Sequence, residues 1–309
     1  MYGSTFGAGR ALVASLDCDE TGGAPCEAGT VGAASCLAHA ASTRSASEAM
    51  HGPRRRIDVD GMATSSARAP RRATARYKDG MCGRYALAAN GDAIATAMRA
   101  TPLLPEIAAW RARFNIAPTQ HAPVACHDRD GVRRLSLMRW GLVPFWAKDA
   151  SIGTRLINAR SDSLAEKPAF REAWKRRRCL VPATAFYEWQ APQEGSSRTK
   201  RPFAVATRRS GDDGAIFALG GLWERWRSPE HDELVSFCVI TVDANDLMRP
   251  LHHRMPLIVP ESAWDRWLGD ATPPSDLLAP FDAGAMRAWP VSTLVNNPRN
   301  DGPDLLADA

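Results

Sequence analysis

The sequence predicts an α+β domain with a largely antiparallel, barrel-like β core flanked by helices. Three observations indicate this fold class. Runs rich in β-branched and aromatic residues outnumber helical patterns, Gly, Pro or charged residues bound each run, and no regular helical crossover separates them. We assign this single domain to residues 81–309, because all 10 Trp residues of the chain lie between Trp110 and Trp289.

The extended runs carry most of this prediction. The stretches expected to be strands are 133–144, 177–189, 202–209, 215–226, 234–244 and 255–260. The polar segments 193–200 and 209–214 are expected to be hairpin loops, because they are rich in Gly, Ser and charged residues.

Helical patterns are fewer. Residues 91–100 are expected to form one helix. A second helix is expected in 167–178, where Phe170 and Trp174 lie four residues apart and so share one helix face. Ser262 and Asp265 resemble a capping pair at the start of a third helix.

Residues 1–80 differ sharply from the rest of the chain. They are rich in Ala, Gly, Ser, Thr and Arg and contain no Trp. Such a segment buries too little apolar surface to offset its ordering entropy. We expect either a disordered leader or a mis-assigned start, with Met81 the true initiator. The longest early apolar run, "ALVASL", is too short and poorly flanked for a signal peptide.

Charge and cysteine usage exclude several function classes. The net charge is +5, and residues 81–309 carry 29 basic and 26 acidic side chains, which excludes a polybasic coat but permits a local basic groove. The chain has 7 Cys residues, and no CxxC or zinc-type spacing occurs among them. We therefore expect no metal, no cofactor and a reducing cytoplasm. Apolar windows are too short for a membrane span, and nucleotide-loop, HExxH and GxSxG motifs are missing from the sequence.

Six short stretches look too specific for a scaffold. They are "MCGRY" (81–85), "FNIAPTQ" (114–120), "RWGLVPFWAKD" (139–149), "INARSDS" (157–163), "RCLVPATAFYEW" (178–189) and "LHHRMP" (251–256). Glu188 lies inside an aromatic strand, so its carboxylate either points to water or is buried for a purpose. His252 and His253 are adjacent, and on a strand they would point to opposite faces.

Together with "WPVSTLVNNPRNDGPDLL" near the C-terminus, these stretches resemble the SRAP (SOS-response-associated peptidase) family. Its members are abasic-site processing proteins that shield damaged single-stranded DNA. The resemblance covers Met81 to about Leu306 and none of residues 1–80. It implies that Cys82 becomes the mature N-terminus, either because Met81 is the initiator or because an autopeptidase activity removes a leader.

An N-terminal Cys suits this chemistry, because it offers an α-amine and a thiol on adjacent carbons. The amine has an ordinary pKa of about 7.7–8.0, so part of it is neutral near pH 7. It can form a Schiff base with the ring-opened aldehyde of an abasic site, and the thiol can then close a thiazolidine ring. An internal Cys has a non-nucleophilic amide nitrogen instead, so the ring requires a free N-terminus.

The resemblance also implies the supporting catalytic residues. Glu188 and His252 match the acid/base positions, and Asn158 matches a position that orients Cys82 and the sugar. Desolvation of a carboxylate such as Glu188 raises its pKa, which suits proton exchange near neutrality. His252 is preferred to His253 because the family pattern places its His two residues before the Arg of "RMP".

The DNA-binding candidates implied by the resemblance are Arg84, Pro118, Trp146, Arg160 and Arg254. The three guanidinium groups could make paired hydrogen bonds to phosphates. Pro118 and Trp146 could wedge or stack against bases of a single strand. Trp140 is the rival for the stacking role of Trp146.

The resemblance thus predicts an autopeptidase that crosslinks abasic sites in single-stranded DNA, with abasic-site lyase activity as a side reaction. A monomer in the cytoplasm is expected, nucleoid-associated when bound to DNA, with no membrane partner. Two alternatives remain open. One is a cysteine peptidase that acts on other proteins through a Cys–His pair. The other is a non-catalytic nucleic-acid-binding module.

Overall fold

The computed structural model describes residues 83–192, 199–208, 215–269 and 271–309. All of them belong to one compact unit. The expected leader, 1–80, and Cys82 lie outside the described residues, as do most of the expected loop 193–200 and all of 209–214.

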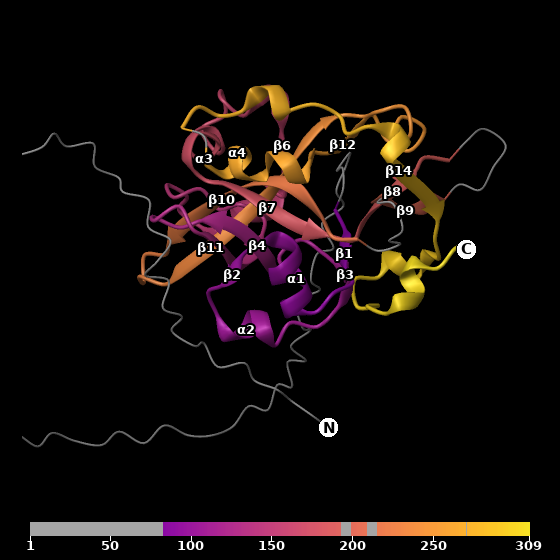
Figure 1. The fold of residues 1–309 in the computed structure, drawn as a ribbon, viewed down its shortest axis with the longest axis horizontal. Coiled ribbons are helices and arrows are strands. Elements are labelled where there is room, and N and C mark those ends of the chain that lie inside the picture. Colours follow the sequence, from indigo (N-terminus) through magenta and orange to yellow (C-terminus); the bar gives the residue numbers. More distant parts are fainter. Residues whose placement is uncertain (1–82, 193–198, 209–214, 270) are drawn as a thin grey trace, which may run out of the picture. The chain divides into compact units, whose positions relative to one another are not determined.

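A closed barrel forms the centre of the domain (Figure 1). Four antiparallel pairings join its strands in the order β11-β10-β7-β4-β5, and a parallel pairing of β5 with β11 closes the ring. This confirms the expected α+β class with a largely antiparallel, barrel-like core. The barrel strands are β4 (His121–His127), β5 (Arg133–Trp140), β7 (Arg178–Ala183), β10 (Phe217–Arg227) and β11 (Glu233–Asp243).

Shorter strands extend the barrel, and a second sheet lies beside it. The barrel carries β2 (Thr101–Pro102) on β5, β6 (Asn158–Arg160) and β12 (Arg254–Pro256) on β11, and β13 (Ile258–Val259) on β10. The second sheet is antiparallel and has the order β14 (Met286–Pro290), β9 (Arg201–Thr207), β8 (Ala185–Gln190), β1 (Tyr85–Leu87) and β3 (Arg113–Ile116).

The chain passes from the barrel to the second sheet at Thr184. The sequence predicts one strand over 177–189, but β7 ends at Ala183 and β8 begins at Ala185. Thr184 donates its backbone N–H to Ala86 O at 2.8 Å, and its hydroxyl accepts from the backbone N–H of Ala88 at 3.0 Å. These bonds dock the junction on β1, so the first strand of the domain is tied to both sheets.

Helices are short and lie outside the barrel. Asn90 caps α1 by accepting from the backbone N–H of Ala93. The expected pair of Ser262 and Asp265 does not cap the last helix, because Asp265 instead forms an ion pair with Arg133. The helices are α1 (Gly91–Met98), α2 (Pro105–Ala108), α3 (Arg171–Arg176) and α4 (Trp264–Gly269). Single 3₁₀ turns cover Ala150–Arg155, Ser161–Ser163, Glu261–Ala263, Ser275–Leu277, Ala283–Ala285, Thr293–Asn296 and Pro303–Leu306.

Aromatic packing joins the two sheets. Tyr85 meets the edge of Trp140 with ring centroids 5.3 Å apart, and Trp140 stacks on Phe237 at 6.2 Å. All three side chains are fully buried, and each such burial stabilises the fold by about 1.5–3 kcal/mol. The start of β1 is therefore fixed against the closure point of the barrel.

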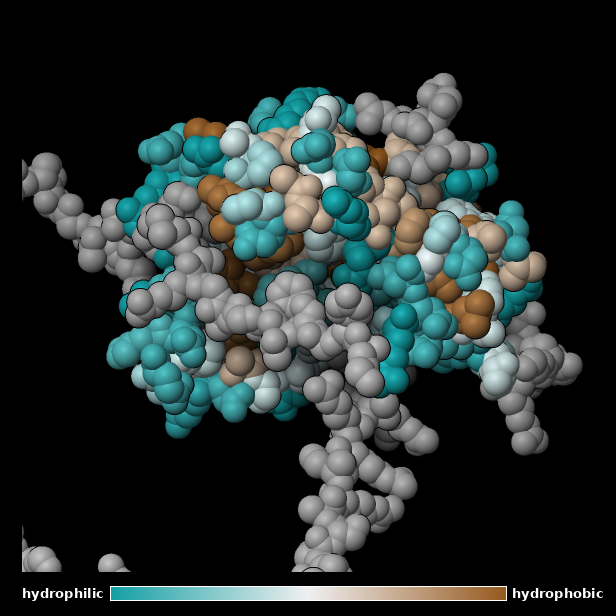
Figure 2. Space-filling view, turned by 90° about the horizontal axis from the view of Figure 1, so that it is seen from below, coloured by the Kyte–Doolittle hydropathy of each residue, from teal (hydrophilic) through white to brown (hydrophobic). Residues whose placement is uncertain are grey.

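Figure 2 shows one face, on which hydrophilic side chains dominate the periphery and apolar ones gather in a few patches. In the part of the chain that the structure describes, no helix has the length and apolar character needed to cross a bilayer.

Candidate functional site

Glu188 is a buried carboxylate beside the beginning of the described chain. β1 and β8 pair with Tyr85 opposite Phe186, and Tyr187 donates its backbone N–H to Arg84 O at 3.0 Å. Continuing this antiparallel register places Gly83 opposite Glu188. Only 3% of Glu188 is exposed, so of the two alternatives that the sequence left open, the side chain takes the inward one.

The turn that carries His252 lies over the same face of β8 as Glu188. Glu188 and Gln190 are two residues apart and therefore point to one side of the strand. Gln190 Nε2 donates to Pro250 O at 3.3 Å, which brings the turn to that side. A buried carboxylate and a histidine from distant parts of the sequence thus share one region of the fold.

His252 is partly buried and His253 is exposed. Both lie in the turn before β12, and their rings stack with centroids 4.3 Å apart, so the expected strand with opposite-facing side chains is wrong. Arg254 donates its backbone N–H to His252 Nδ1 at 3.1 Å. The neutral imidazole of His252 therefore carries its proton on Nε2, the atom that remains for proton exchange.

Asn158 begins β6, which pairs with β11. The residue before it, Ile157, accepts a hydrogen bond from Trp140 Nε1 at 2.9 Å, and Trp140 also contacts Tyr85 of β1. A chain of buried contacts therefore connects Asn158 to the start of β1. Since Trp140 is fully buried, it cannot stack on a base, which removes the rival of Trp146.

Arg254 is 5% exposed, and the fold holds its guanidinium group. Nη1 donates to Asp243 at 2.8 Å, and Nη2 donates to Ser161 Oγ at 3.3 Å and to Thr241 O at 2.5 Å. These contacts tie β12 to β11 and to the segment after β6. Arg254 therefore fixes the His252 turn relative to Asn158.

Arg160 has the opposite setting, because 57% of its side chain is exposed. It pairs with Asp162 at 2.7 Å, and this hydrogen bond raises the pKa of Arg160 and lowers the pKa of Asp162. An exposed ion pair of this kind contributes little to stability. Arg160 is thus available at the surface next to Asn158.

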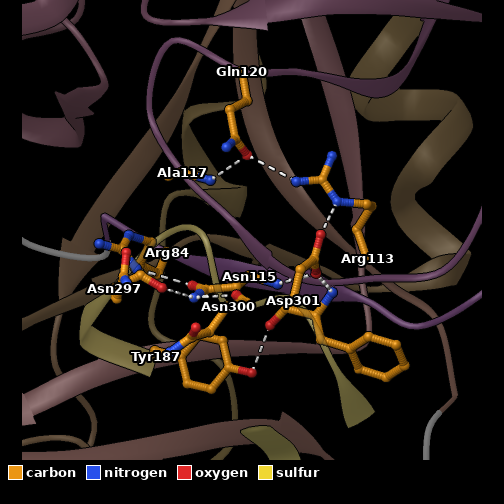
Figure 3. Close-up of polar contacts among 10 residues, drawn as sticks. Arg84, Arg113, Asn115, Ala117, Gln120, Tyr187, Asn297, Asn300 and Asp301 are labelled. Atoms are coloured by element: carbon orange, nitrogen blue, oxygen red, sulfur yellow. Dashed lines mark hydrogen bonds and ion pairs between the residues drawn. The ribbon is translucent and has the colours of Figure 1, made fainter. Parts of the chain in front are cut away.

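Arg84 is held by Asn115 (Figure 3) and by the C-terminal part of the chain. Its Nη1 donates to Asn115 Oδ1 at 3.0 Å and to Val295 O at 2.7 Å, and its Nη2 donates to Asn296 O at 3.2 Å. Desolvation lowers the pKa of Arg84, although the nearby Tyr187 opposes this. The arginine of "MCGRY" is therefore part of an internal hydrogen-bond network.

Asn115 and Asp301 complete this network, and the sequence reasoning missed both. Fully buried Asn115 donates through Nδ2 to Val295 O, Asn297 O and Asn300 O at 2.9–3.2 Å. Asp301 pairs with Arg113 and accepts from the backbone N–H of Asn115 at 3.1 Å. Asn115 lies in "FNIAPTQ" and Asp301 in "NNPRNDG", so these motifs contained the signal.

The aromatic candidates are at the surface. Trp146 and its neighbour Phe145 are each 48% exposed. Together with Pro168, Arg171 and Glu172 they line an open pocket of about 330 Å³. Pro118 is half-buried in the turn after β3, followed by Thr119 with a φ of 74°. These groups lie away from the buried core and are accessible to a large ligand.

A hydrogen bond from Gln190 to Pro250 joins the strand of Glu188 to the turn of His252. Arg254 ties that turn to the segment after Asn158, and Trp140 connects the residue before Asn158 to β1. The fold places Arg84 in a separate internal network and leaves Arg160 and Trp146 exposed. No group of three or more His, Cys, Asp or Glu side chains with metal-binding geometry occurs among the described residues.

These features define an α+β fold in the described residues, with the candidate catalytic site beside β1. A sequence profile of the SOS response associated peptidase (SRAP) family matches residues 81–298. The abasic site processing protein YoqW of Bacillus subtilis (strain 168) is 38% identical over 73% of this chain and 99% of its own length. The abasic site processing protein HMCES of Mus musculus is 32% identical over 63% of this chain and 65% of its own.

Solved structures share the fold. A protein from Bacteroides thetaiotaomicron matches with a TM-score of 0.64 at 27% identity, over 74% of this chain and 100% of its own. A protein from Bordetella bronchiseptica matches with a TM-score of 0.58 at 25% identity, over 68% and 100%. The chain belongs to the SRAP family.

Proposed function

We propose that this protein processes abasic sites in single-stranded DNA by forming a thiazolidine crosslink through Cys82, once Met81 and all residues upstream of it are removed. The observation that carries the proposal is the burial of Glu188 on β8, the strand that pairs with β1, which begins three residues after Cys82 in the sequence. The relatives named abasic site processing proteins support the substrate class.

The proposed reaction has two bond-forming steps. The neutral α-amine of Cys82 adds to the aldehyde carbon, and loss of water gives the imine. The thiol then adds across the C=N bond, so that sulfur joins carbon and a proton ends on nitrogen. Glu188 and His252 Nε2 exchange the protons that ring opening and dehydration require, and Asn158 orients the sugar.

The same site would expose the amine. In this proposal the protein is an autopeptidase, because expelling the peptide before Cys82 also needs a proton donor such as Glu188. A Schiff base that is not captured by the thiol can undergo β-elimination, which gives abasic-site lyase activity as a side reaction.

The DNA contacts divide by exposure. Arg160, Pro118 and Trp146 reach the surface and are proposed to meet phosphates and bases directly. Arg84 and Arg254 remain phosphate candidates, but each also holds parts of the site together. We propose that the protein acts as a cytoplasmic monomer without metal or cofactor and joins the nucleoid when it is bound to DNA.

The test compares two chains, one expressed from Met81 and one with residues 1–80 retained. Intact mass spectrometry identifies the first residue of each, and denaturing gels follow adduct formation on an abasic oligonucleotide. The chain that begins with Cys82 is expected to form a heat-stable adduct, and a chain with Cys82 internal is expected to form none. An adduct of equal yield from a chain that retains Met81 would refute the role of the free amine.

Acetylation of the α-amine separates the alternative functions. It abolishes thiazolidine formation, spares a thiol peptidase that acts on other proteins, and leaves simple nucleic-acid binding nearly unchanged. An undamaged oligonucleotide of the same sequence is the control for the aldehyde.

A further inference from the structure

Arg139, at the end of β5, is a half-buried cation without a counter-charge in the described chain. Its Nη1 is fully buried and has no hydrogen-bond partner among the described residues. Desolvation lowers the pKa of Arg139, and no described carboxylate opposes this effect. Leaving a buried donor of a charged group unpaired is costly, so the fold tolerates a local cost at this position.

A second basic side chain lies directly opposite. His121 of β4 is the cross-strand partner of Arg139. Partial desolvation and, second, the positive charge of Arg139 lower the pKa of His121. A lowered pKa favours the neutral imidazole, so Arg139 supplies the positive charge of this spot at the rim of the barrel. His121 is exposed beside it and can donate or accept a hydrogen bond.

This spot lies between the two segments that carry the predicted base-contacting residues. On one side, the turn with Pro118 is bonded to the end of β5, because Trp140 donates its backbone N–H to Gln120 O at 2.9 Å. On the other side, Arg139 Nη1 packs against Gly153, where an added Cβ would approach it to 3.1 Å. Gly153 belongs to the loop that begins after Trp146.

We propose that Arg139 and His121 form a phosphate-binding subsite for the backbone of the single-stranded DNA, between the Pro118 turn and the Trp146 loop. The inference rests on the proposed function, since it takes the strand that Pro118 and Trp146 would contact as its ligand. A phosphodiester supplies the negative charge that Arg139 lacks, and it would meet the solvent-exposed part of this half-buried side chain, because Nη1 itself is buried. The subsite contributes to the affinity for DNA and not to catalysis.

Three variants test the subsite. Arg139→Gln removes the charge, and His121→Asp supplies an internal carboxylate that competes with phosphate for Arg139. Arg134→Gln is the matched control, because it removes one charge from the same strand where Asp128 already pairs with it at 2.7 Å. Binding of a labelled, undamaged single strand is measured by fluorescence anisotropy over a range of salt, with a thermal melt of each protein.

The logarithm of the wild-type binding constant is expected to fall with the logarithm of the salt concentration. In Arg139→Gln the magnitude of this slope is expected to decrease by about 0.7, the value for one lost phosphate contact on a single strand. Affinity at low salt is expected to drop about tenfold. His121→Asp is expected to bind as weakly and yet melt at the same or a higher temperature, whereas Arg134→Gln binds like wild type.

A purely structural role for Arg139 predicts a different result, namely that His121→Asp stabilises the protein and leaves DNA binding unchanged. That result overturns the proposal, even where Arg139→Gln fails to fold. Failure of the wild-type protein to bind single strands overturns it as well. Normal binding without an adduct on abasic DNA refutes the proposed crosslinking chemistry instead, and the subsite is then judged on the binding data alone.

Discussion

Glu188 is a carboxylate that the fold keeps from water, within a strand of aromatic residues. Buried charged groups are rare unless they are paired or used, because moving a charge out of water is costly. A surface residue at this place would tolerate substitution. Because Glu188 is buried, the effect of substituting it on the reaction rate can distinguish a catalytic role from a structural one.

Glu188→Gln is expected to slow adduct formation on an abasic oligonucleotide by about 100-fold or more, since it keeps the shape of the side chain and removes the titrating group. The measurement is a time course of adduct formation, with a thermal melt as the folding control. Glu224→Gln is the matched variant, because Glu224 is also buried and pairs with Arg177 at 2.9 Å. It is expected to alter the melt and not the rate. Wild-type rates in Glu188→Gln would assign it a structural role alone.

Cys82→Ala retains the α-amine and loses the thiol. It is expected to form a reversible Schiff base that borohydride traps, without any stable adduct. The readout is a heat-stable band with and without borohydride on the same abasic strand. A heat-stable adduct from this variant in the absence of borohydride would rule out the thiazolidine.

At the scale of single residues, the sequence indicated which side chains are candidates for the site, but not the surroundings of each one. The aromatic neighbours of Glu188 left its direction open, because a strand alone does not say which face is covered. The resemblance implied a phosphate contact for Arg254, and nothing in the sequence indicated its partners Asp243 and Thr241, which lie on another strand. Only the pairing of β11 with β12 brings them together.

Among the elements, the turn between β4 and β5 depends on a single carboxylate. Asp128 is 8% exposed and accepts from the backbone N–H groups of Asp130 and Val132 at 3.0 and 2.9 Å, and from Arg134 Nε at 2.7 Å. Burial alone would raise the pKa of Asp128, but these hydrogen bonds outweigh it and lower the pKa. The turn is therefore held by an ionised group.

Asp128→Asn is expected to lower Tm by about 3–6 °C at pH 7, because a hydrogen bond to a charged group is replaced by a weaker one. The folded pKa lies below the ordinary value of about 3.9, so the contribution is fully present above that pH and lost as the pH falls through the folded pKa. The gap in Tm between the two proteins should therefore close below about pH 4. Melts at several pH values measure it. Asp130→Asn, an exposed change in the same turn, is the control, and a gap that persists at low pH would contradict the ionised role.

The strands were easier to predict than the helices. The β-branched and aromatic runs found four of the five barrel strands, because half-buried strands need such residues, but they did not include β4. The helix expected in 167–178 is longer than α3, because helix propensity alone does not fix where tertiary contacts end a short helix. The break at Thr184 was missed, because its cause is a hydrogen bond to β1, almost a hundred residues away in the sequence.

On the scale of the whole molecule, the pair of strands that closes the barrel could not be predicted. β5 and β11 pair in parallel through Ser236 with Arg139 and Phe237 with Trp140. Strand patterns show which residues face a core, but they do not name the partner strand. The candidate site depends on this closure, because it brings the chain after Trp140 beside β11.

The described cysteine side chains of the barrel are buried away from solvent. Cys126, Cys179 and Cys238 are fully buried in β4, β7 and β11, and burial raises the pKa of Cys179 and Cys238. Since the thiolate is the reactive form, these side chains should resist alkylation. A chain that begins at Cys82 is expected to take up one equivalent of iodoacetamide when native and four when denatured, as measured by mass spectrometry. Cys82→Ala is the control with no rapid uptake, and rapid native labelling of a barrel cysteine would contradict the buried setting.

The bond from Arg84 to Val295 O joins residues 211 positions apart. A ribosome adding about 5–20 residues per second needs roughly 10–40 s to make the intervening chain. During that time the groups that hold the first strand do not yet exist. If synthesis begins at Met81, as the proposed function allows, the nascent chain can lose this Met while the region around Glu188 is still unassembled. The Cys82 end would then become chemically free before it becomes positioned. Competence for the reaction would then begin with the completion of synthesis.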